Sequence, residues 1–167
     1  TLSPAEMEEL SIASWMHDLG KIVTPAEIMD KATKLEGLWD RLELVKSRFD
    51  TVEAILLMQL ERPNLTSQQS SILKSGLQQL SADREFLSSI NRGDFCMTDD
   101  DIVRIDEITS RKYRAGEREY CLLTPAEADC LKIRSGTLSG DDIHKMREHA
   151  LITHEMLQQL SFPRKYS

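Results

Sequence analysis

Hydrophobic residues recur at intervals of three and four positions along most of the chain, which is the spacing of one face of an α-helix. The first such run lies within residues 4–19 and contains Met7, Leu10, Ala13 and Met16. Gly20 follows directly, and a glycine at this place commonly ends a helix. The pattern predicts a first helix over about 4–19 with one face on a core.

A heptad pattern of hydrophobic residues marks the next part of the chain. It comprises Leu35, Leu38, Leu42, Val45, Phe49, Val52 and Leu56. A second helical run, after Pro63, comprises Ile72, Leu73, Leu77, Leu80, Leu87 and Ile90. The two runs predict an antiparallel helical hairpin. The pattern leaves open whether this hairpin projects from the domain or forms a core helix pair.

Shorter elements are expected in the second half of the chain. Helices are predicted over about 99–108, 124–134 and 140–160. The stretch 111–123, with Gly116 near its middle, is the one place where a small β-hairpin or an ordered loop is expected. The sequence shows no sustained alternation with a period of two elsewhere, so the expected fold class is all-α.

Several helix starts carry a capping signature. Ser3, Thr24 and Thr124 are each followed by Pro-Ala-Glu, with a hydroxyl at the N-cap, proline at the first helical position and glutamate at the third. Ser139 is a weaker start, with Asp142 at the third position. The residues that follow the Pro-Ala-Glu motifs do not match, so these are helix starts and not an internal repeat.

Composition and charge limit the kind of protein. Of the 167 residues, 40% are hydrophobic and 29% charged, which is typical of a soluble globular protein. The length suits one domain with a core, or one domain plus an insertion. The net charge of −7 argues against DNA, RNA or an anionic membrane as the main partner. An anionic substrate would need metal ions or local Lys and Arg side chains to offset this charge.

Cysteine usage and hydropathy suggest a compartment. The 3 cysteines form no CxxC pair, and no hydrophobic run approaches the roughly 20 residues of a membrane helix. No signal peptide is recognised either, and we expect a cytoplasmic location. The chain opens with Thr1 and stops at Ser167 without a tapering tail, so we expect it to be a piece of a longer protein. A sensor or membrane domain elsewhere in that longer protein is compatible with this expectation.

The adjacent pair His17-Asp18, at the end of the first predicted helix, is the first candidate for chemistry. A neutral imidazole is a nitrogen ligand for metals, and the two oxygens of one carboxylate can bridge two ions. Such mixed donors suit Fe, Mn, Zn or Ni better than Ca. The dipeptide is common by chance and equally fits a polar helix end, so alone it does not establish a site.

The residues around this pair are more specific. The string His-Asp-Leu-Gly-Lys-Ile, then Thr-Pro and Ile-Met-Asp-Lys, within 17–31 resembles the signature of HD-domain metal-dependent phosphohydrolases, specifically the HD-GYP family. The resemblance implies an HD-domain helical bundle. It also implies that His17 and Asp18 are metal ligands and that Lys21 lies near the substrate phosphate.

A second block extends the resemblance. It comprises Gly136-Thr137-Leu138-Ser139, Met146, His149, Thr153, Met156-Leu157 and Phe162-Pro163. In the family this block is a Leu-Thr helix start, a ligand histidine, a small residue four positions on, and an apolar-Pro ending. It implies that His149 is a third metal ligand. His144 and His154 are expected to be surface or packing residues.

The chain departs from the usual family pattern in two ways. His17 and His149 are far apart, which implies core segments at about 1–34 and 124–167 of a partial HD-GYP domain, with a helical insertion at about 35–123. The flanks of the insertion resemble a subgroup that carries one. The family's upstream ligand histidine, its His-His-Glu and Gly-Tyr-Pro motifs and a later aspartate do not occur in the sequence.

The resemblance implies a bacterial signalling phosphodiesterase that hydrolyses cyclic di-GMP with two or three divalent metal ions, Fe or Mn in preference to Zn or Ni. Asp18 would bridge the metals, and His17 and His149 would each bind one. Asp18 and Lys21 are the expected catalytic residues, with Lys21 stabilising charge on the phosphate. The isolated chain is expected to be inactive and to bind metal weakly or not at all.

Two other functions stay open. One is a degenerate HD domain that binds a nucleotide or a partner protein and catalyses nothing. The other is an HD nucleotidase that acts on another phosphate ester. For the phosphodiesterase as well as for the degenerate domain, the predicted helices within 35–90 offer a surface for a homodimer or for signal input.

Overall fold

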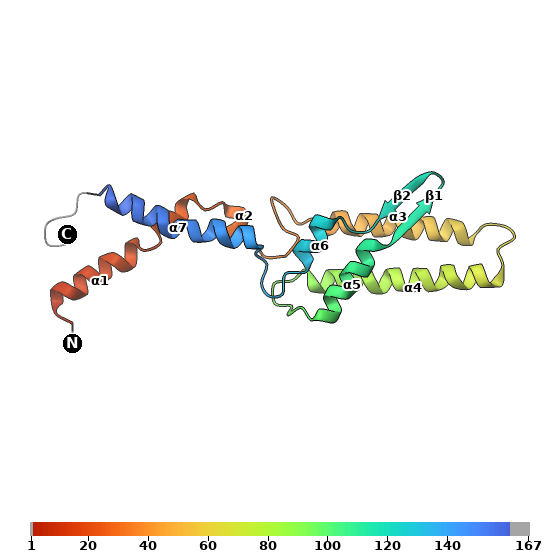
Figure 1. Cartoon of the computed structure of the whole chain (residues 1–167), viewed down its shortest axis with the longest axis horizontal. Helices are drawn as coiled ribbons and strands as arrows, with labels where there is room; N and C mark the ends of the chain where they lie inside the picture. Colours follow the sequence, from red (N-terminus) through yellow and green to blue (C-terminus); the bar gives the residue numbers. More distant parts are fainter. Residues whose placement is uncertain (1, 161–167) are drawn as a thin grey trace. The chain divides into compact units, whose positions relative to one another are not determined.

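The chain folds into helices and one small β-hairpin in a computed structural model that describes residues 2–160 (Figure 1). The elements are α1 (Pro4–Met16), the 3₁₀ helix η1 (Leu19–Val23), α2 (Ala26–Met29), α3 (Leu42–Leu60), α4 (Ser67–Ile90), α5 (Asp99–Ser110), β1 (Lys112–Ala115), β2 (Arg118–Cys121), α6 (Pro125–Leu131) and α7 (Gly140–Gln158). The predicted all-α class is confirmed. The chain divides into a split unit, residues 1–30 with 138–167, and a central unit, residues 31–137.

A continuous hydrophobic core holds the central unit together. α3 and α4 lie side by side as the predicted antiparallel hairpin (Figure 1). Val45, Phe49 and Val52 of α3 are almost fully buried. They belong to one cluster with Leu80, Leu87 and Ile90 of α4 and with Ile105, Ile108, Leu122, Leu123 and Leu131. Part of the hairpin is therefore a core helix pair.

The end of the hairpin near the α3–α4 turn is more exposed. Leu57, Met58 and Ile72 all have side chains open to solvent. One end of the hairpin is therefore core, and the other end leaves hydrophobic residues uncovered. None of the helices described in residues 2–160 has the length and apolar character needed to span a membrane.

The start of this hairpin differs from the heptad prediction. α3 begins at Leu42 and not near 35, and Leu38 of the predicted seam is 91% exposed. Asp40 accounts for the difference. Its carboxylate accepts hydrogen bonds from the Leu42 backbone N–H at 2.8 Å and from Thr33 Oγ1 at 2.9 Å. These bonds hold the preceding residues as an ordered loop and satisfy a free N–H at the helix start.

The limits of the central unit also differ from the insertion read from the sequence. The sequence places 124–134 in a core segment, but α6 belongs to the central unit. Arg48 of α3 donates two hydrogen bonds to the Glu127 carboxylate of α6, at 2.6 and 2.9 Å. The buried Lys34 donates to the Ile133 carbonyl oxygen at 2.7 Å, just beyond the C-terminal end of α6, where a cation is favoured.

Capping boxes begin most of the helices. The predicted boxes at Ser3, Thr124 and Ser139 are confirmed, each with both hydrogen bonds. The prediction at Thr24 is wrong, because Thr24 ends η1 and Pro25 is the N-cap of α2 without a side-chain hydrogen bond. Two further boxes, at Thr66 and Thr98, were not predicted from the sequence.

The predicted β-hairpin is present in the central unit. β1 and β2 are antiparallel, with Lys112 opposite Cys121 and Ala115 opposite Arg118. Gly116 lies in the turn with a φ of 62°, a conformation that glycine adopts without steric cost. The glycine inside 111–123 was therefore a correct signal for a tight turn.

The split unit has little hydrophobic core. η1 packs along α7, and α2 also contacts α7. Among the described residues of this unit, Ile28 is the one buried hydrophobic side chain. α1 ends at Met16 and buries none of its residues, and Met7 and Leu10 are more than half exposed. The prediction that this helix packs one face on a core is therefore wrong within residues 2–160.

Candidate metal-binding site

The three predicted metal ligands come from two segments of the split unit. His17 is the C-cap residue of α1, Asp18 is the N-cap residue of η1, and His149 lies near the middle of α7. Because η1 packs against α7, the HD motif lies beside the second block. The Phe162-Pro163 ending of that block lies outside the described residues.

The contact between η1 and α7 depends on a glycine and a threonine. The Gly20 N–H donates to Thr153 Oγ1 at 2.8 Å, and Thr153 Oγ1 donates to the His149 carbonyl oxygen at 2.8 Å. A Cβ added to Gly20 would lie 2.1 Å from that carbonyl oxygen. Gly20 thus permits close backbone packing. It lies within η1 and is not the helix stop that the sequence predicted.

Asp18 is the centre of the cluster. His17 Nε2 lies 3.0 Å from Asp18 Oδ2, and His149 Nε2 lies 3.7 Å from Asp18 Oδ1. Lys21 Nζ lies 2.7 Å from Asp18 Oδ2 and donates a hydrogen bond to it. The two imidazoles therefore face different oxygens of one carboxylate. This is the arrangement expected where one carboxylate bridges two metal ions.

The second ring nitrogen of each histidine faces a backbone carbonyl one turn earlier. His17 Nδ1 lies 2.6 Å from the Ser14 carbonyl oxygen, and His149 Nδ1 contacts the Met146 carbonyl oxygen. A neutral imidazole has one N–H, so donation to the carbonyl leaves a lone pair on Nε2 facing Asp18. A bond from the other ring nitrogen to a carbonyl is usual in metal-binding histidines.

The site residues differ in exposure, and Asp18 is ionised. The side chain of His17 is 65% exposed, and that of His149 is 21% exposed. The hydrogen bond from Lys21 is the main cause that holds the pKa of Asp18 below its ordinary value, and the nearby histidines act in the same direction. The cluster therefore contains an ionised carboxylate that is paired with Lys21, and its His17 side is open to solvent.

The donor set fits a divalent metal in type but not in number. Two imidazole nitrogens and a carboxylate suit Fe, Mn, Zn or Ni. Nowhere in the described part of the chain, however, are three His, Cys, Asp or Glu side chains placed to hold an ion together. Lys21 also pairs with the same Asp18 oxygen as His17. The chain thus offers two partial sites that share Asp18.

The other two histidines lie on the exposed surface of α7. His144 Nδ1 is 3.3 Å from the Glu148 carboxylate, and His154 Nε2 is 2.9 Å from Gln158 Nε2. Each contact joins residues one turn apart, as expected for a solvated helix face. The sequence indicates Thr153 only as a small residue, and its hydrogen bonds to Gly20 and His149 were not predicted. A hydroxyl four positions after a candidate ligand, on the same helix face, is the signal that could have found it.

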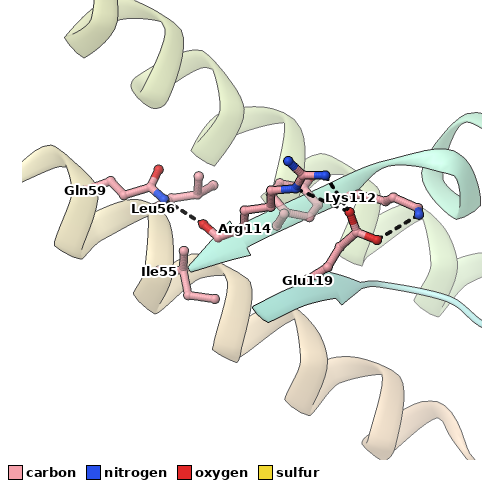
Figure 2. A pocket seen from close by; sticks show the side chains of 7 residues that line it. Ile55, Leu56, Gln59, Lys112, Arg114 and Glu119 are labelled. Carbon is pink, nitrogen blue, oxygen red and sulfur yellow. Dashed lines mark hydrogen bonds and ion pairs between the residues drawn. The ribbon is translucent and has the colours of Figure 1, made fainter. Parts of the chain in front are cut away.

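A separate pocket lies in the central unit, between α3 and the β-hairpin (Figure 2). It has a volume of about 520 Å³ and is lined by Ile55, Leu56, Gln59, Lys112, Tyr113, Arg114 and Glu119. Figure 2 shows that Lys112 and Arg114 both pair with Glu119. Gln59 Nε2 donates to the Arg114 carbonyl oxygen at 3.0 Å. The pocket lining has one carboxylate, already paired, and no histidine, so it lacks the donors that a metal centre needs.

Comparisons with protein-family models, with curated proteins and with solved structures find no match to this chain. The HD-GYP family expected from the motifs is therefore neither supported nor contradicted by a relative. The features of the split unit that bear on function are the HD motif, His149 and the hydrogen bonds that join their two segments.

Proposed function

We propose that the chain contributes the cluster of His17, Asp18 and His149 to the active site of a metal-dependent phosphodiesterase of the HD-GYP type. The proposed substrate is the cyclic dinucleotide cyclic di-GMP. The observation that supports this most strongly is that two imidazoles from distant segments face different oxygens of Asp18. Each also has its second ring nitrogen on a backbone carbonyl, which leaves Nε2 as the ligand atom.

Each residue of the cluster has a distinct task. His17 and His149 would each hold one divalent ion through Nε2, and Asp18 would contribute its two oxygens to both. Bound divalent ions lower the pKa of coordinated water and hold the phosphate for in-line attack. Lys21, the cation beside Asp18, would stabilise the negative charge that develops on the phosphoryl oxygens.

The overall charge supports a metal requirement. The chain carries a net charge of −7, and the cluster itself contains an ionised carboxylate. A cyclic dinucleotide has two phosphates, and it would be repelled from this surface unless cations were bound there. Lys21 supplies one positive charge but shares it with Asp18. Two or three divalent ions, Fe or Mn in preference to Zn or Ni, would reverse the local field.

The full site requires more ligands than these residues supply. The family's His-His-Glu and Gly-Tyr-Pro motifs do not occur in the 167 residues. Three side chains cannot complete the coordination of two ions that prefer about six ligands each. Hydrolysis is therefore proposed for a protein that has these residues together with the missing ligands. The chain alone is expected to be inactive and to bind metal weakly or not at all.

Metal binding and hydrolysis test the proposal together. Mn²⁺ binding to the chain is measured by electron paramagnetic resonance, and cyclic di-GMP hydrolysis is measured in a protein that also carries the missing motifs. Asp18→Asn should abolish both, because it removes the charge and one bridging oxygen. His154→Gln is the matched control on α7 and should change neither. Hydrolysis that persists in the Asp18→Asn protein would contradict the proposal, and hydrolysis of simple nucleotides but not cyclic di-GMP would favour the nucleotidase.

The Lys21–Asp18 pair favours one second candidate, a nucleotide-binding module without catalysis. The pair occupies the oxygen that a metal would need at 2.7 Å, so the cluster is electrostatically satisfied in part without an ion. Such a module would bind cyclic di-GMP equally well with and without a chelator and would hydrolyse nothing. The phosphodiesterase would lose binding when the chelator removes its metal.

A further inference from the structure

We infer that Thr153 is a positioning residue of the metal centre, because its hydroxyl joins η1 to α7 and so sets the distance between Asp18 and His149. The inference rests on the proposed function, since it assigns a task toward the metal ligands. It concerns a residue that does not itself coordinate a metal. Its evidence is the pair of hydrogen bonds that one buried hydroxyl makes to both segments.

The Thr153 hydroxyl uses its donor and an acceptor position at once. Its proton is donated to the His149 carbonyl oxygen at 2.8 Å, and its oxygen accepts the Gly20 N–H at 2.8 Å. A hydroxyl has a single proton, so donation to His149 leaves its lone pairs for Gly20. Thr153 is only 5% exposed, and water therefore competes poorly for either bond.

Both bonds end close to the metal ligands in sequence. One bond reaches the backbone of His149 itself, and the other reaches Gly20, two residues after Asp18. Across this contact His149 Nε2 lies 3.7 Å from Asp18 Oδ1. A shift of η1 along α7 would change this distance directly. The backbones are already at their closest approach, since a Cβ on Gly20 would lie 2.7 Å from the Thr153 nitrogen.

A purely helical role for Thr153 would explain only one of the bonds. Threonine in a helix commonly donates to the carbonyl four residues earlier, and Thr109 does so in α5, with Oγ1 2.7 Å from the Ile105 carbonyl oxygen. Thr153 makes the same bond to His149 and in addition accepts a long-range bond across 133 positions of sequence. The second bond is the one that fixes the positions of η1 and α7, which carry the ligands, relative to each other.

The experiment compares three variants of the full chain by Mn²⁺ affinity, measured by electron paramagnetic resonance. Thr153→Val keeps the shape but removes the hydroxyl, and should weaken Mn²⁺ binding by about tenfold or more. Thr153→Ser keeps the hydroxyl and should restore the wild-type affinity. Thr109→Val removes an equivalent helix bond in the central unit and should leave the affinity unchanged. Hydrogen exchange at the Gly20 amide should be faster in Thr153→Val only.

The outcomes separate this inference from the proposed function. Wild-type affinity in Thr153→Val overturns the inference and leaves the proposed function standing. A wild-type chain that binds no Mn²⁺ even at high metal concentration overturns the inference, whereas the proposed function is overturned by the hydrolysis assay in the protein that carries the missing motifs. If Thr153→Val destabilises α7, the Thr153→Ser variant tests the inference instead. The inference is overturned if Thr153→Ser binds Mn²⁺ as weakly as Thr153→Val while its Gly20 amide stays protected from exchange.

Discussion

The two units of the chain are stabilised by different means. The central unit contains all but one of the buried hydrophobic side chains found in residues 2–160, and the exception, Ile28, lies in the split unit. The split unit instead depends on the backbone approach of η1 to α7 and on the Gly20–Thr153 hydrogen bond. All the candidate metal ligands belong to the split unit.

This contrast separates stability from chemistry. Hydrophobic burial contributes most of the free energy of folding but does not depend strongly on direction. Hydrogen bonds contribute little net free energy each, yet they fix distances and angles between specific atoms. The central unit is thus the source of stability, and the split unit has the directional contacts that a metal site requires. Changes in one unit should leave the defining property of the other largely intact.

The largest expected effect comes from the core of the central unit. Phe49 is 1% exposed, and Phe49→Ala should lower the free energy of unfolding by about 3–5 kcal/mol, because it removes a buried ring and leaves a cavity. Urea denaturation followed by circular dichroism measures the loss. Leu38→Ala is the control, since Leu38 is 91% exposed and should cost almost nothing. A Phe49→Ala cost no larger than that of Leu38→Ala would contradict the assignment of stability to this core.

A smaller effect, confined to the split unit, is expected at Gly20. Gly20→Ala places a Cβ 2.1 Å from the His149 carbonyl oxygen, and the overpacking should cost about 1–3 kcal/mol locally. Hydrogen exchange should show faster amides in α7 and unchanged amides in α3 and α4. Gly37→Ala is the control, because no atom lies within 4 Å of the added Cβ. Equal protection of α7 in both variants would show that the close approach is not needed.

The sequence predicted most of the fold, for a physical reason. Periodic burial and capping are local, so the long helices and the capping boxes at Ser3, Thr124 and Ser139 could be read from neighbouring residues. Leu35 shows the limit of prediction from local patterns. It is fully buried, as the heptad pattern implied, but it lies outside α3. Burial does not specify the element, and the hydrogen bonds of Asp40 decide where the helix begins.

The sequence predicted the residue types of the candidate site but little of its geometry. The HD motif and His149 were chosen by their resemblance to a family, and the structure brings them together on Asp18. The resemblance includes Thr153 only as a small residue, and neither the bond of its hydroxyl to Gly20 nor the packing role of Gly20 could be read in this way. Their bond joins residues 133 positions apart, and no local spacing encodes which distant backbone a hydroxyl will meet.

The smallest of these effects is a pH dependence that belongs to the central unit alone. Burial would raise the pKa of Glu127, but hydrogen bonds from Arg48 and from Thr124 outweigh burial and lower it below the ordinary value of 4.5. Because the folded-state pKa is the lower one, the ionised pair stabilises the fold fully above pH 4.5, and this contribution is lost as the pH falls through the folded-state value. Glu127→Gln should therefore lose less stability than the wild type on acidification, by about 1 kcal/mol.

Urea denaturation at neutral pH and at acidic pH measures that difference. Glu119→Gln is the matched control, since Glu119 pairs with Lys112 on the exposed hairpin and its contribution is screened by solvent. If the Arg48–Glu127 pair acts only within the central unit, acidification should change hydrogen exchange in α7 by the same amount in Glu127→Gln and in the wild type. A larger change in α7 of one protein would show that the two units share stability, and the separation of stability from chemistry would then have to be given up.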